Sequence, residues 1–203
     1  MASTLFQPAT LGPLTLRNRF IKAATFEGRT HGSAVSSDLI EFHRRVAAGG
    51  AAMTTVAYLA VAPGGRTDEN AIWLRPEVVG GLRDLTDAVH TEGALAAAQI
   101  GHAGPVANAS SNRAPAYAPG RFFNPLGMRR TRAADEADIA RITSEFATGT
   151  RLAVQAGFDA LEVHLGHNYL LSSFLSPLLN RRDDRWGGSL ENRARFARQV
   201  LHA

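Results

Sequence analysis

The stretch GFDALEVHLGHNYLL, residues 157–171, joins a short apolar strand to a cluster of polar side chains. Side chains of a strand alternate between its two faces, so Glu162 and His164 share one face. His164 stands at the carboxyl end of the predicted strand, and His167 and Tyr169 follow in the loop. Parallel α/β folds place their chemistry at the carboxyl ends of strands. This stretch therefore predicts both the kind of fold and the position of a site.

Strand-like and helix-like segments alternate along the rest of the chain. Apolar runs predict strands over 20–24, 51–57, 94–100 and 159–164, after an N-terminal hairpin over 5–16. Helical spacing predicts helices from Ser37 or Asp38 to Gly49, Pro76 to Gly93, Asp135 to Gly157, and Leu190 to Ala203. Such alternation is typical of a parallel sheet with helices outside it. We expect the remaining long segments, 101–134 and 165–190, to be loops.

Capping and breaking residues mark the helix boundaries. Ser37 or Asp38 is expected to cap the first helix and Asp135 a later one, because their side chains accept backbone N–H groups. Pro76 fits the first turn of a helix, where its missing N–H costs little. Gly149 is expected to interrupt the helix that Asp135 begins, at a cost of roughly 1 kcal/mol relative to Ala.

The composition argues against several classes of protein. The 203 residues contain no Cys, so they build no disulfide, thiolate nucleophile, iron–sulfur cluster or Cys-based zinc site. No signal peptide or membrane-spanning stretch is recognisable, so the expected compartment is the cytoplasm. The net charge of +4 comes from arginines that alternate with acidic residues, so no nucleic-acid partner is expected. No G-x-G-x-x-G fingerprint follows the first strand, which argues against a dinucleotide-binding domain.

The residues alone leave three interpretations of the His and Tyr cluster. The imidazoles could bind a metal with Glu162, but no second ligand cluster is recognisable, and no metal site is predicted. They could instead satisfy the hydrogen bonds of a loop or the core. Finally, two imidazoles and a phenol could donate hydrogen bonds and a proton to an anion.

Several segments resemble the old yellow enzyme family and follow the family's order along essentially the whole chain. They are Leu5-Phe6, LRNRF at 16–20, VAPGGR at 61–66, QIGHAG at 99–104 and the block 157–196. Members of that family are FMN-dependent ene reductases on a (β/α)8 barrel. The resemblance implies an α/β fold of the (β/α)8 TIM-barrel type. It also implies reduction of activated C=C bonds, in enones or nitroalkenes, by NADH or NADPH through FMN.

The same resemblance implies the catalytic residues. His164 and His167 match the pair that hydrogen-bonds the carbonyl or nitro oxygen of the substrate, an oxyanion-hole role. Tyr169 matches the proton donor. Gln99 matches the amide that contacts the pyrimidine edge of the flavin, and His164 is also expected to lie against the cofactor.

The segment before the first helix departs from the family pattern. Ala23 and Ala24 match positions whose backbone packs on the flavin ring. The family's Thr or Cys that hydrogen-bonds flavin O4 falls on Phe26, one residue after Thr25. Either Thr25 supplies the hydroxyl through a small register shift, or the bond is absent and Phe26 is a packed aromatic. His102 is expected either to face the cofactor or to hold the long loop that follows it.

Other conspicuous side chains are expected to be structural. Trp73 and Trp186 are expected to pack, because large aromatic side chains dominate buried area. Arg193, Arg195 and Arg198 match a structural helix of the family. The family's FMN phosphate is held by loops after the seventh and eighth strands, so these arginines are not expected to bind it.

The chain is short for a complete barrel, which takes about 250 residues. We expect residues 1–203 to form the N-terminal half of a single FMN-binding barrel domain, with four βα units and a small-molecule alkene as substrate. Alone, such a half is expected not to retain FMN. Two alternatives stay open: a non-catalytic half-barrel that associates with itself or a partner, and the N-terminal part of a dienoyl-CoA reductase-like enzyme with an iron–sulfur extension. A homo-oligomer is compatible with each.

Overall fold

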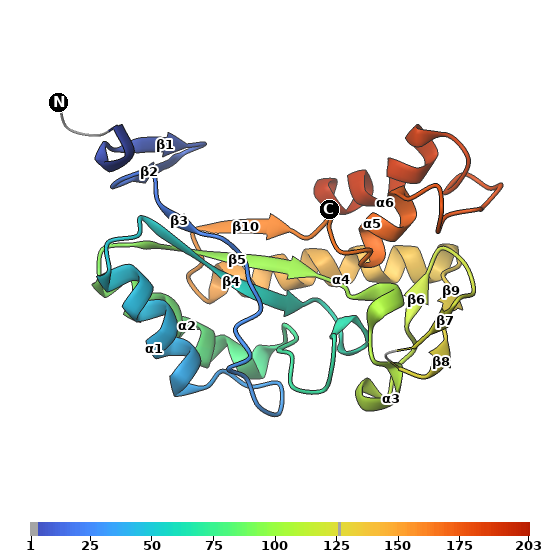
Figure 1. The fold of residues 1–203 in the computed structure, drawn as a ribbon, viewed down its shortest axis with the longest axis horizontal. Helices are drawn as coiled ribbons and strands as arrows, with labels where there is room; N and C mark the ends of the chain where they lie inside the picture. The colour runs from blue at the N-terminus through green and yellow to red at the C-terminus, as the bar shows by residue number, and fades with distance from the viewer. Residues whose placement is uncertain (1–3, 126) are drawn as a thin grey trace.

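A four-stranded parallel sheet forms the centre of the computed structural model, which describes residues 4–125 and 127–203 (Figure 1). Its strands are β3 (Ile21–Lys22), β4 (Met53–Ala60), β5 (Leu95–Gly101) and β10 (Ala160–Val163). They lie side by side in chain order, and each neighbouring pair is parallel. Parallel neighbours need a crossover connection, and a helix lies in each one here. The four strands predicted from the apolar runs are therefore confirmed.

The helices of the crossovers cover the sheet and build the main core. They are α1 (Ser37–Ala48), α2 (Pro76–Thr91) and α4 (Glu136–Gln155). Figure 1 shows α1 and α2 together along one side of the sheet, with α4 passing behind the strands. Leu82, Leu85, Ile142 and Phe146 are almost fully buried where the helices meet the sheet. The apolar stripes that predicted these helices are thus the faces that they bury.

The capping of two helices tests the boundary predictions. Ser36 caps α1, so the expectation of Ser37 or Asp38 is wrong by one or two residues. The backbone of Ser36 is extended, and its side chain accepts an N–H group of the first turn. Asp135 caps α4 as predicted, and it shares a capping box with Asp138, in which each side chain accepts the other's backbone N–H.

Helix α4 runs through Gly149 without a break, so the predicted interruption is wrong. A Cβ atom at Gly149 would lie 3.1 Å from a methyl carbon of Leu74 and 3.3 Å from one of Val61. The glycine therefore allows the helix to approach the chain just beyond β4. Pro76 begins α2, as predicted.

The N-terminal segment forms the predicted hairpin. A 3-10 turn, η1 (Thr4–Phe6), precedes β1 (Ala9–Leu11) and β2 (Leu14–Leu16), which pair antiparallel. Arg17 follows, and its guanidinium donates to the carbonyl oxygens of Ala47, Ala51 and Glu92. These carbonyls lie where α1 and α2 end, so one side chain satisfies both helix ends and attaches the hairpin to them.

The two segments expected to be loops contain short elements. Residues 101–134 hold η3 (Gly104–Val106), α3 (Ala109–Asn112), β6 (Tyr117–Ala118), β7 (Phe123–Asn124), β8 (Arg129–Arg130) and β9 (Arg132–Ala133). A further turn, η2 (Pro63–Gly65), follows β4, and α5 (Leu170–Leu175) lies within 165–190. Strand β6 pairs with β9 and β7 with β8. Strands of two residues are too short to show a period, so the sequence pattern could not predict them.

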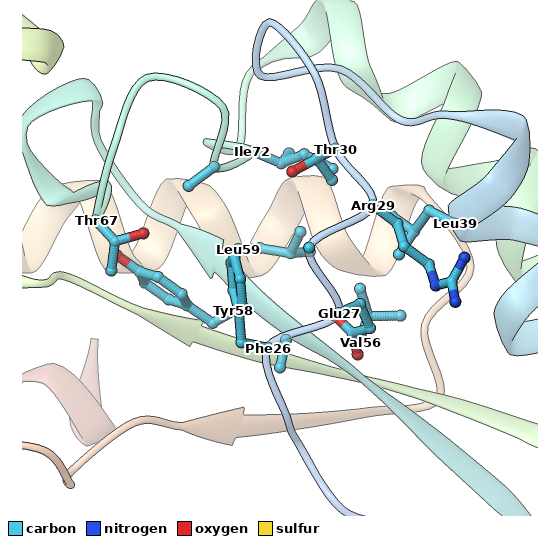
Figure 2. Close-up of a pocket in the computed structure, with 13 residues that line it drawn as sticks. Phe26, Glu27, Arg29, Thr30, Leu39, Val56, Tyr58, Leu59, Thr67 and Ile72 are labelled. Carbon is cyan, nitrogen blue, oxygen red and sulfur yellow. The ribbon is translucent and has the colours of Figure 1, made fainter.

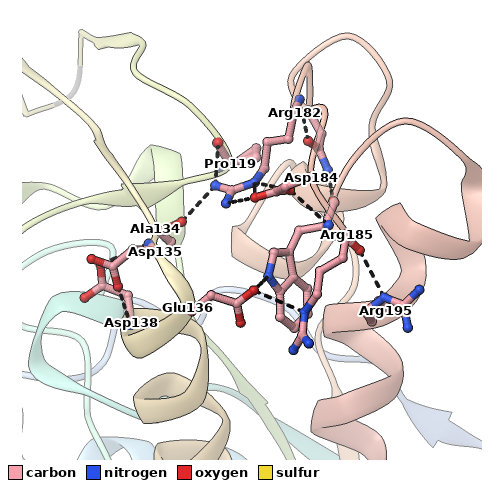
Figure 3. Close-up of polar contacts among 11 residues, drawn as sticks. Pro119, Ala134, Asp135, Glu136, Asp138, Arg182, Asp184, Arg185 and Arg195 are labelled. Carbon is pink, nitrogen blue, oxygen red and sulfur yellow. Dashed lines mark hydrogen bonds and ion pairs between the residues drawn. The ribbon is translucent and has the colours of Figure 1, made fainter.

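Residues 180–198, here called the arginine segment, connect α5 to α6 (Leu190–His202) and include its first part. Figure 3 shows how their polar groups are bonded. Arg182 donates to the carbonyl oxygens of Pro119 and Ala134, at 3.2 and 2.8 Å, and pairs with Asp184 at 2.5 Å. Arg195 donates to the carbonyl oxygen of Arg185 at 3.0 Å.

Trp186 is the apolar centre of the arginine segment and is only 1% exposed. Its ring packs edge-on to Phe196, which in turn packs on Phe174. The indole N–H donates to Glu136 at 2.7 Å, so the polar edge of the ring is also satisfied. The predicted packing role of Trp186 is confirmed, while Trp73 is half-buried.

Candidate functional site

An open cleft lies where the sheet strands end. It is lined by Ala24, Thr25, Phe26, Ala57, Tyr58, Thr67, Gln99, His164, His167 and Tyr169. These residues come from the segment after β3, from the later parts of β4 and β5, from the chain after η2, and from the chain after β10. Of the residues that the resemblance indicated for the site, Ala23 and His102 are not among those that line the cleft.

His164, His167 and Tyr169 form a compact cluster of rings in this cleft. The Nε2 atom of His164 lies 3.1 Å from Nδ1 of His167, a hydrogen-bond distance. The ring of Tyr169 stands edge-on to His164, with the centroids 4.6 Å apart, and its centroid is 5.8 Å from that of His167. Two imidazoles and a phenol thus gather at one wall, as their sequence spacing predicted.

The backbone after β10 turns sharply to bring these rings together. His167 and Asn168 both adopt the left-handed conformation, with φ of 56° and 55°. That conformation costs an L-residue roughly 1–2 kcal/mol, although Asn and His accept it more readily than most. The N–H of Tyr169 closes the turn by donating to the carbonyl oxygen of Gly166 at 3.0 Å. Strain of this kind is concentrated at functional sites.

The surroundings of the rings set their protonation. Burial lowers the pKa of His164, and the nearby imidazole of His167 lowers it further. Burial raises the pKa of the Tyr169 phenol above its ordinary value, and the charge of Asp68 acts in the same direction. At neutral pH, His164 is therefore a neutral imidazole, and Tyr169 retains its proton.

Gln99 contributes a buried amide from β5. Its side chain is 8% exposed, and Nε2 donates to Oε1 of Glu162 at 2.5 Å. The two residues are direct partners in the parallel pairing of β5 with β10. A primary amide has two N–H donors and a carbonyl acceptor, so one bond to Glu162 leaves capacity for a ligand.

The segment after β3 presents small side chains and one exposed ring. Ala24 and Thr25 line the cleft, whereas Ala23 is exposed outside it. Phe26 also lines the cleft and is 80% exposed, so the interpretation of Phe26 as a packed aromatic is wrong. The exposed ring is free to contact a ligand, and the hydroxyl of Thr25 is the polar group of this segment in the cleft.

Tyr58 is the main site residue that the sequence analysis missed. It projects from β4 toward Thr67, as Figure 2 shows, and its hydroxyl donates to the carbonyl oxygen of Gly65. Its ring lies 5.4 Å from that of Tyr169 and 6.3 Å from that of His164. The strand was predicted to end at residue 57, and its continuation to Ala60 is the signal that would have placed Tyr58 at the cleft.

His102 is a structural residue. It is 2% exposed, and its Nδ1 accepts the backbone N–H of Gly104 at 3.0 Å. Its ring lies close to Tyr117 and to Gly65, where a Cβ atom would be 3.0 Å from the imidazole. Burial lowers the pKa of His102 to about 3, so the ring is neutral. Of the two expected roles, the structure supports holding the chain that follows β5.

The described ranges, 4–125 and 127–203, contain no group of three or more His, Asp or Glu side chains arranged to hold a metal ion. Within the same residues, no helix has both the length and the apolar character that crossing a membrane requires.

Comparisons with known proteins agree on one family. The model of the NADH:flavin oxidoreductase / NADH oxidase family matches residues 4–203. The chain is 58% identical, over 98% of its length, to the 4,4'-dithiodibutanoate disulfide reductase of Rhodococcus erythropolis, of which it covers 50%. It therefore spans about half the length of this relative.

Solved structures show the same architecture. The Old Yellow Enzyme of a Pichia species matches 99% of the chain with a TM-score of 0.92, at 24% identity and 56% coverage of that protein. Morphinone reductase in complex with tetrahydroNAD matches 98% of the chain with a TM-score of 0.89, at 27% identity and 60% coverage of that protein. The predicted resemblance and the (β/α)8 TIM-barrel type of fold are thus confirmed, with a part of the barrel in this chain.

The family match extends from Thr4 to the last residue, so it includes the sheet, the cleft and the arginine segment together. The chain belongs to the NADH:flavin oxidoreductase / NADH oxidase family, a family of FMN-dependent oxidoreductases.

Proposed function

We propose that this chain carries the substrate-binding part of an FMN-dependent reductase that uses NADH or NADPH to reduce an activated C=C bond. The observation that supports this most is the convergence of His164, His167, Tyr169 and Gln99 on one cleft. Reduction of an enone or nitroalkene creates negative charge on the substrate's oxygen and requires a proton at carbon. Two imidazoles and a protonated phenol meet both requirements.

The donor set of the cleft suits the flat ring system of FMN. Ala24 and Thr25 offer a wall of small side chains, and the amide of Gln99 can present a donor and an acceptor to the imide edge of the ring. FMN, when bound, would supply the hydride, and the protein would orient the cofactor and the substrate. Ala23 and His164 are proposed to contact the cofactor from the edges of this wall.

The two histidines are proposed to hold the substrate's oxygen. Their facing nitrogens, 3.1 Å apart, bond to each other in the structure, so a substrate oxygen would replace this bond and accept an N–H group from each ring. Donors aimed at developing charge act more strongly in a site that excludes water. Tyr169 is proposed to give its phenolic proton to the α-carbon, and its raised pKa keeps that proton available at neutral pH.

A second candidate reaction is the reduction of an organic disulfide to two thiols. The 58% identity to the Rhodococcus disulfide reductase favours it. Two electrons and two protons would convert R–S–S–R to two R–SH, with the electrons coming from NADH or NADPH through FMN. Residues 1–203 contain no Cys, so this chain offers no thiol for exchange with the substrate.

We further propose that residues 1–203 form the N-terminal half of a single barrel domain. The parallel strands follow one another in chain order, and the chain covers 50% of its disulfide reductase relative. On this proposal the 203 residues alone do not retain FMN. A non-catalytic half-barrel that associates with itself or a partner, and a relative with an iron–sulfur extension, remain the alternatives. A cytoplasmic location and a homo-oligomer stay predictions.

The test compares two substrates. It uses the whole protein, meaning the complete barrel of which residues 1–203 are the N-terminal half on this proposal. Protein purified with FMN is given NADH or NADPH, then 2-cyclohexenone or 4,4'-dithiodibutanoate, and oxidation of the nicotinamide is followed. Turnover of the enone supports C=C reduction, and turnover of the disulfide alone supports the second candidate. Absence of protein-bound flavin, or turnover of neither substrate, would contradict the proposal, and Tyr169→Phe serves as the control for the site.

A further inference from the structure

A buried ion pair lies behind the wall of the cleft and takes no part in the proposed reaction. Nζ of Lys22 is 2.6 Å from Oε1 of Glu27, and the two side chains are 15% and 3% exposed. In every other Lys or Arg ion pair of the described residues, at least one side chain is 39% or more exposed. This pair is thus unusual in having both charges shielded from water.

The carboxylate of Glu27 connects three parts of the fold. Besides Lys22 of β3, it accepts the backbone N–H of Ala57 in β4. Its Oε1 atom also lies 3.5 Å from Nε2 of His43, on α1. Lys22 makes a second contact with β4, because its ammonium donates to the carbonyl oxygen of Thr55 at 3.1 Å. The pair therefore attaches the segment after β3 to β4 through both charged groups.

The charges in this cluster balance. Burial raises the pKa of Glu27, while the hydrogen bond and the charge of Lys22 oppose that shift. Burial lowers the pKa of His43 to about 3, and the charge of Lys22 lowers it further, so the imidazole is neutral. Its Nδ1 atom is bonded to the hydroxyl of Thr54 at 2.7 Å. One positive and one negative charge remain, each with the other as its counterion.

The pair is one layer of residues away from the candidate site. Glu27 lines a small cavity that Figure 2 shows beside β4. Phe26, Ala57, Tyr58 and Thr67 line both this cavity and the cleft. Glu27 is bonded to Ala57 and directly follows Phe26 in the chain, so any shift of its carboxylate would move two residues of the shared wall.

We propose that Lys22 and Glu27 form a positioning pair, which holds residues 23–26 against β4 and so sets the shape of the wall on which FMN lies. The inference rests on the proposed function, because FMN is the group that would contact this wall. Stability alone does not explain the pair, since the desolvation of two buried charges offsets most of their attraction. Apolar side chains of similar volume would stabilise the fold as well, but they would not hold the N–H of Ala57.

The experiment uses the whole protein and four variants. Glu27→Gln keeps the shape of the side chain and removes its charge, Lys22→Met removes the partner charge, and the double variant removes both. Glu41→Gln is the matched control, because Glu41 pairs with arginines on the surface of α1. Three quantities are measured: the FMN dissociation constant, the reduction potential of bound flavin, and hydrogen exchange in the flavin-free protein.

The positioning role predicts changes confined to the wall. Each single variant should weaken FMN binding about tenfold or more, the range expected for a charged hydrogen bond, and the double variant should bind no more weakly than the worse single one. Glu27→Gln should raise the flavin potential, because the charge of Lys22 loses its counterion. Exchange should become about tenfold faster in peptides over 20–30 and 55–60, with no change in α2, α4 or the Glu41→Gln control.

The possible results distinguish a failure of the positioning role from a failure of the proposed function. FMN affinity and exchange within about twofold of the unaltered protein, together with a lower unfolding temperature, would mean that the pair is only structural. If the unaltered protein binds no FMN, the proposed function fails, and hydrogen exchange in the flavin-free protein still decides the positioning role. Unchanged exchange over 20–30 and 55–60 in Glu27→Gln overturns the inference in either case.

Discussion

The candidate site and the arginine segment are neighbours in the chain, yet they use polar side chains in opposite ways. In the arginine segment, Arg182 bonds to two backbone carbonyls and a carboxylate (Figure 3). The indole of Trp186 bonds to another carboxylate. In the site, His164 and His167 bond to each other, and the rings face a cleft. The sequence predicts this division, because Trp186, Arg193 and Arg195 are expected to be structural and the two histidines to be functional.

This contrast distinguishes polar residues that stabilise the fold from polar residues that can bind a ligand. A donor whose partners lie away from any cleft contributes to the fold, typically by about 1 kcal/mol, and is not presented to a ligand. A donor held at a cleft on strained backbone, as at His167, contributes little to the fold and is available for binding. The predictions below test this contrast, beginning with the largest expected effect.

Tyr169→Phe should lower the activity of the candidate site without changing the structure of the arginine segment. We expect kcat for C=C reduction to fall by about 10²–10⁴-fold, because the phenyl ring keeps the packing but has no proton to give. Disulfide reduction should change by less than about tenfold, since thiolates with a pKa near 8.5 take protons from water. Steady-state rates with both substrates check this, and an equal loss on both would refute the proton-donor role.

His164→Leu should remove one of the two oxyanion donors while keeping a buried side chain of similar size. The expected loss in kcat is about 10²–10³-fold, the range for one donor of an oxyanion hole. The unfolding midpoint should change little, because a buried neutral imidazole is replaced by an apolar group. A rise in KM with kcat unchanged would show that His164 binds substrate and transition state equally.

Asn180→Leu should destabilise the arginine segment without affecting the site. Nδ2 of Asn180 donates to the carbonyl oxygens of Phe174 and Trp186, at 2.7 Å each, and the residue is 4% exposed. Losing the amide leaves two buried acceptors unpaired, so we expect the free energy of unfolding to fall by about 2–3 kcal/mol. Denaturant unfolding measures this, and kcat below the unfolding transition should stay within twofold.

His43→Leu should make the protein less sensitive to acid. The folded-state pKa of His43 is lowered to about 3 from the ordinary 6.5, so between these values the unfolded chain binds a proton that the folded chain does not. Stability from this residue is therefore present above pH 6.5 and is lost as the pH falls toward 3. The variant should reduce the slope of unfolding free energy against pH by about 1.4 kcal/mol per pH unit in that window.

Denaturant unfolding at several pH values checks this slope. Asn180 has no titratable group and its amide bonds only to backbone groups, so Asn180→Leu is the matched control and should leave the slope as it is. An unchanged slope in His43→Leu would mean that the imidazole is charged in the folded protein, next to Glu27.

Arg185→Met should have the smallest effect. Arg185 pairs with Glu136 at 3.1 Å, but the two side chains are 62% and 61% exposed. Water screens such a pair, so we expect the free energy of unfolding to change by less than about 1 kcal/mol and kcat to be unaffected. A larger loss of stability would show that the exposed arginines of this segment act as a network.

Much of the fold could be predicted from local sequence patterns. Apolar periodicity and caps gave the order of the strands and helices, because both signals depend on residues within a few positions of each other. The spacing of His164, His167 and Tyr169 likewise predicted a polar cluster after a strand, and the motif order pointed to the correct family.

Other features depend on tertiary contacts between residues far apart in the chain. Gly149 allows α4 to pack closely against Leu74, and Tyr58 reaches the cleft because β4 extends beyond its predicted end. Glu27 meets the backbone of Ala57, thirty positions away, only when β3 and β4 pair. No local period encodes such contacts, since the folded chain alone brings the partners together and removes them from water.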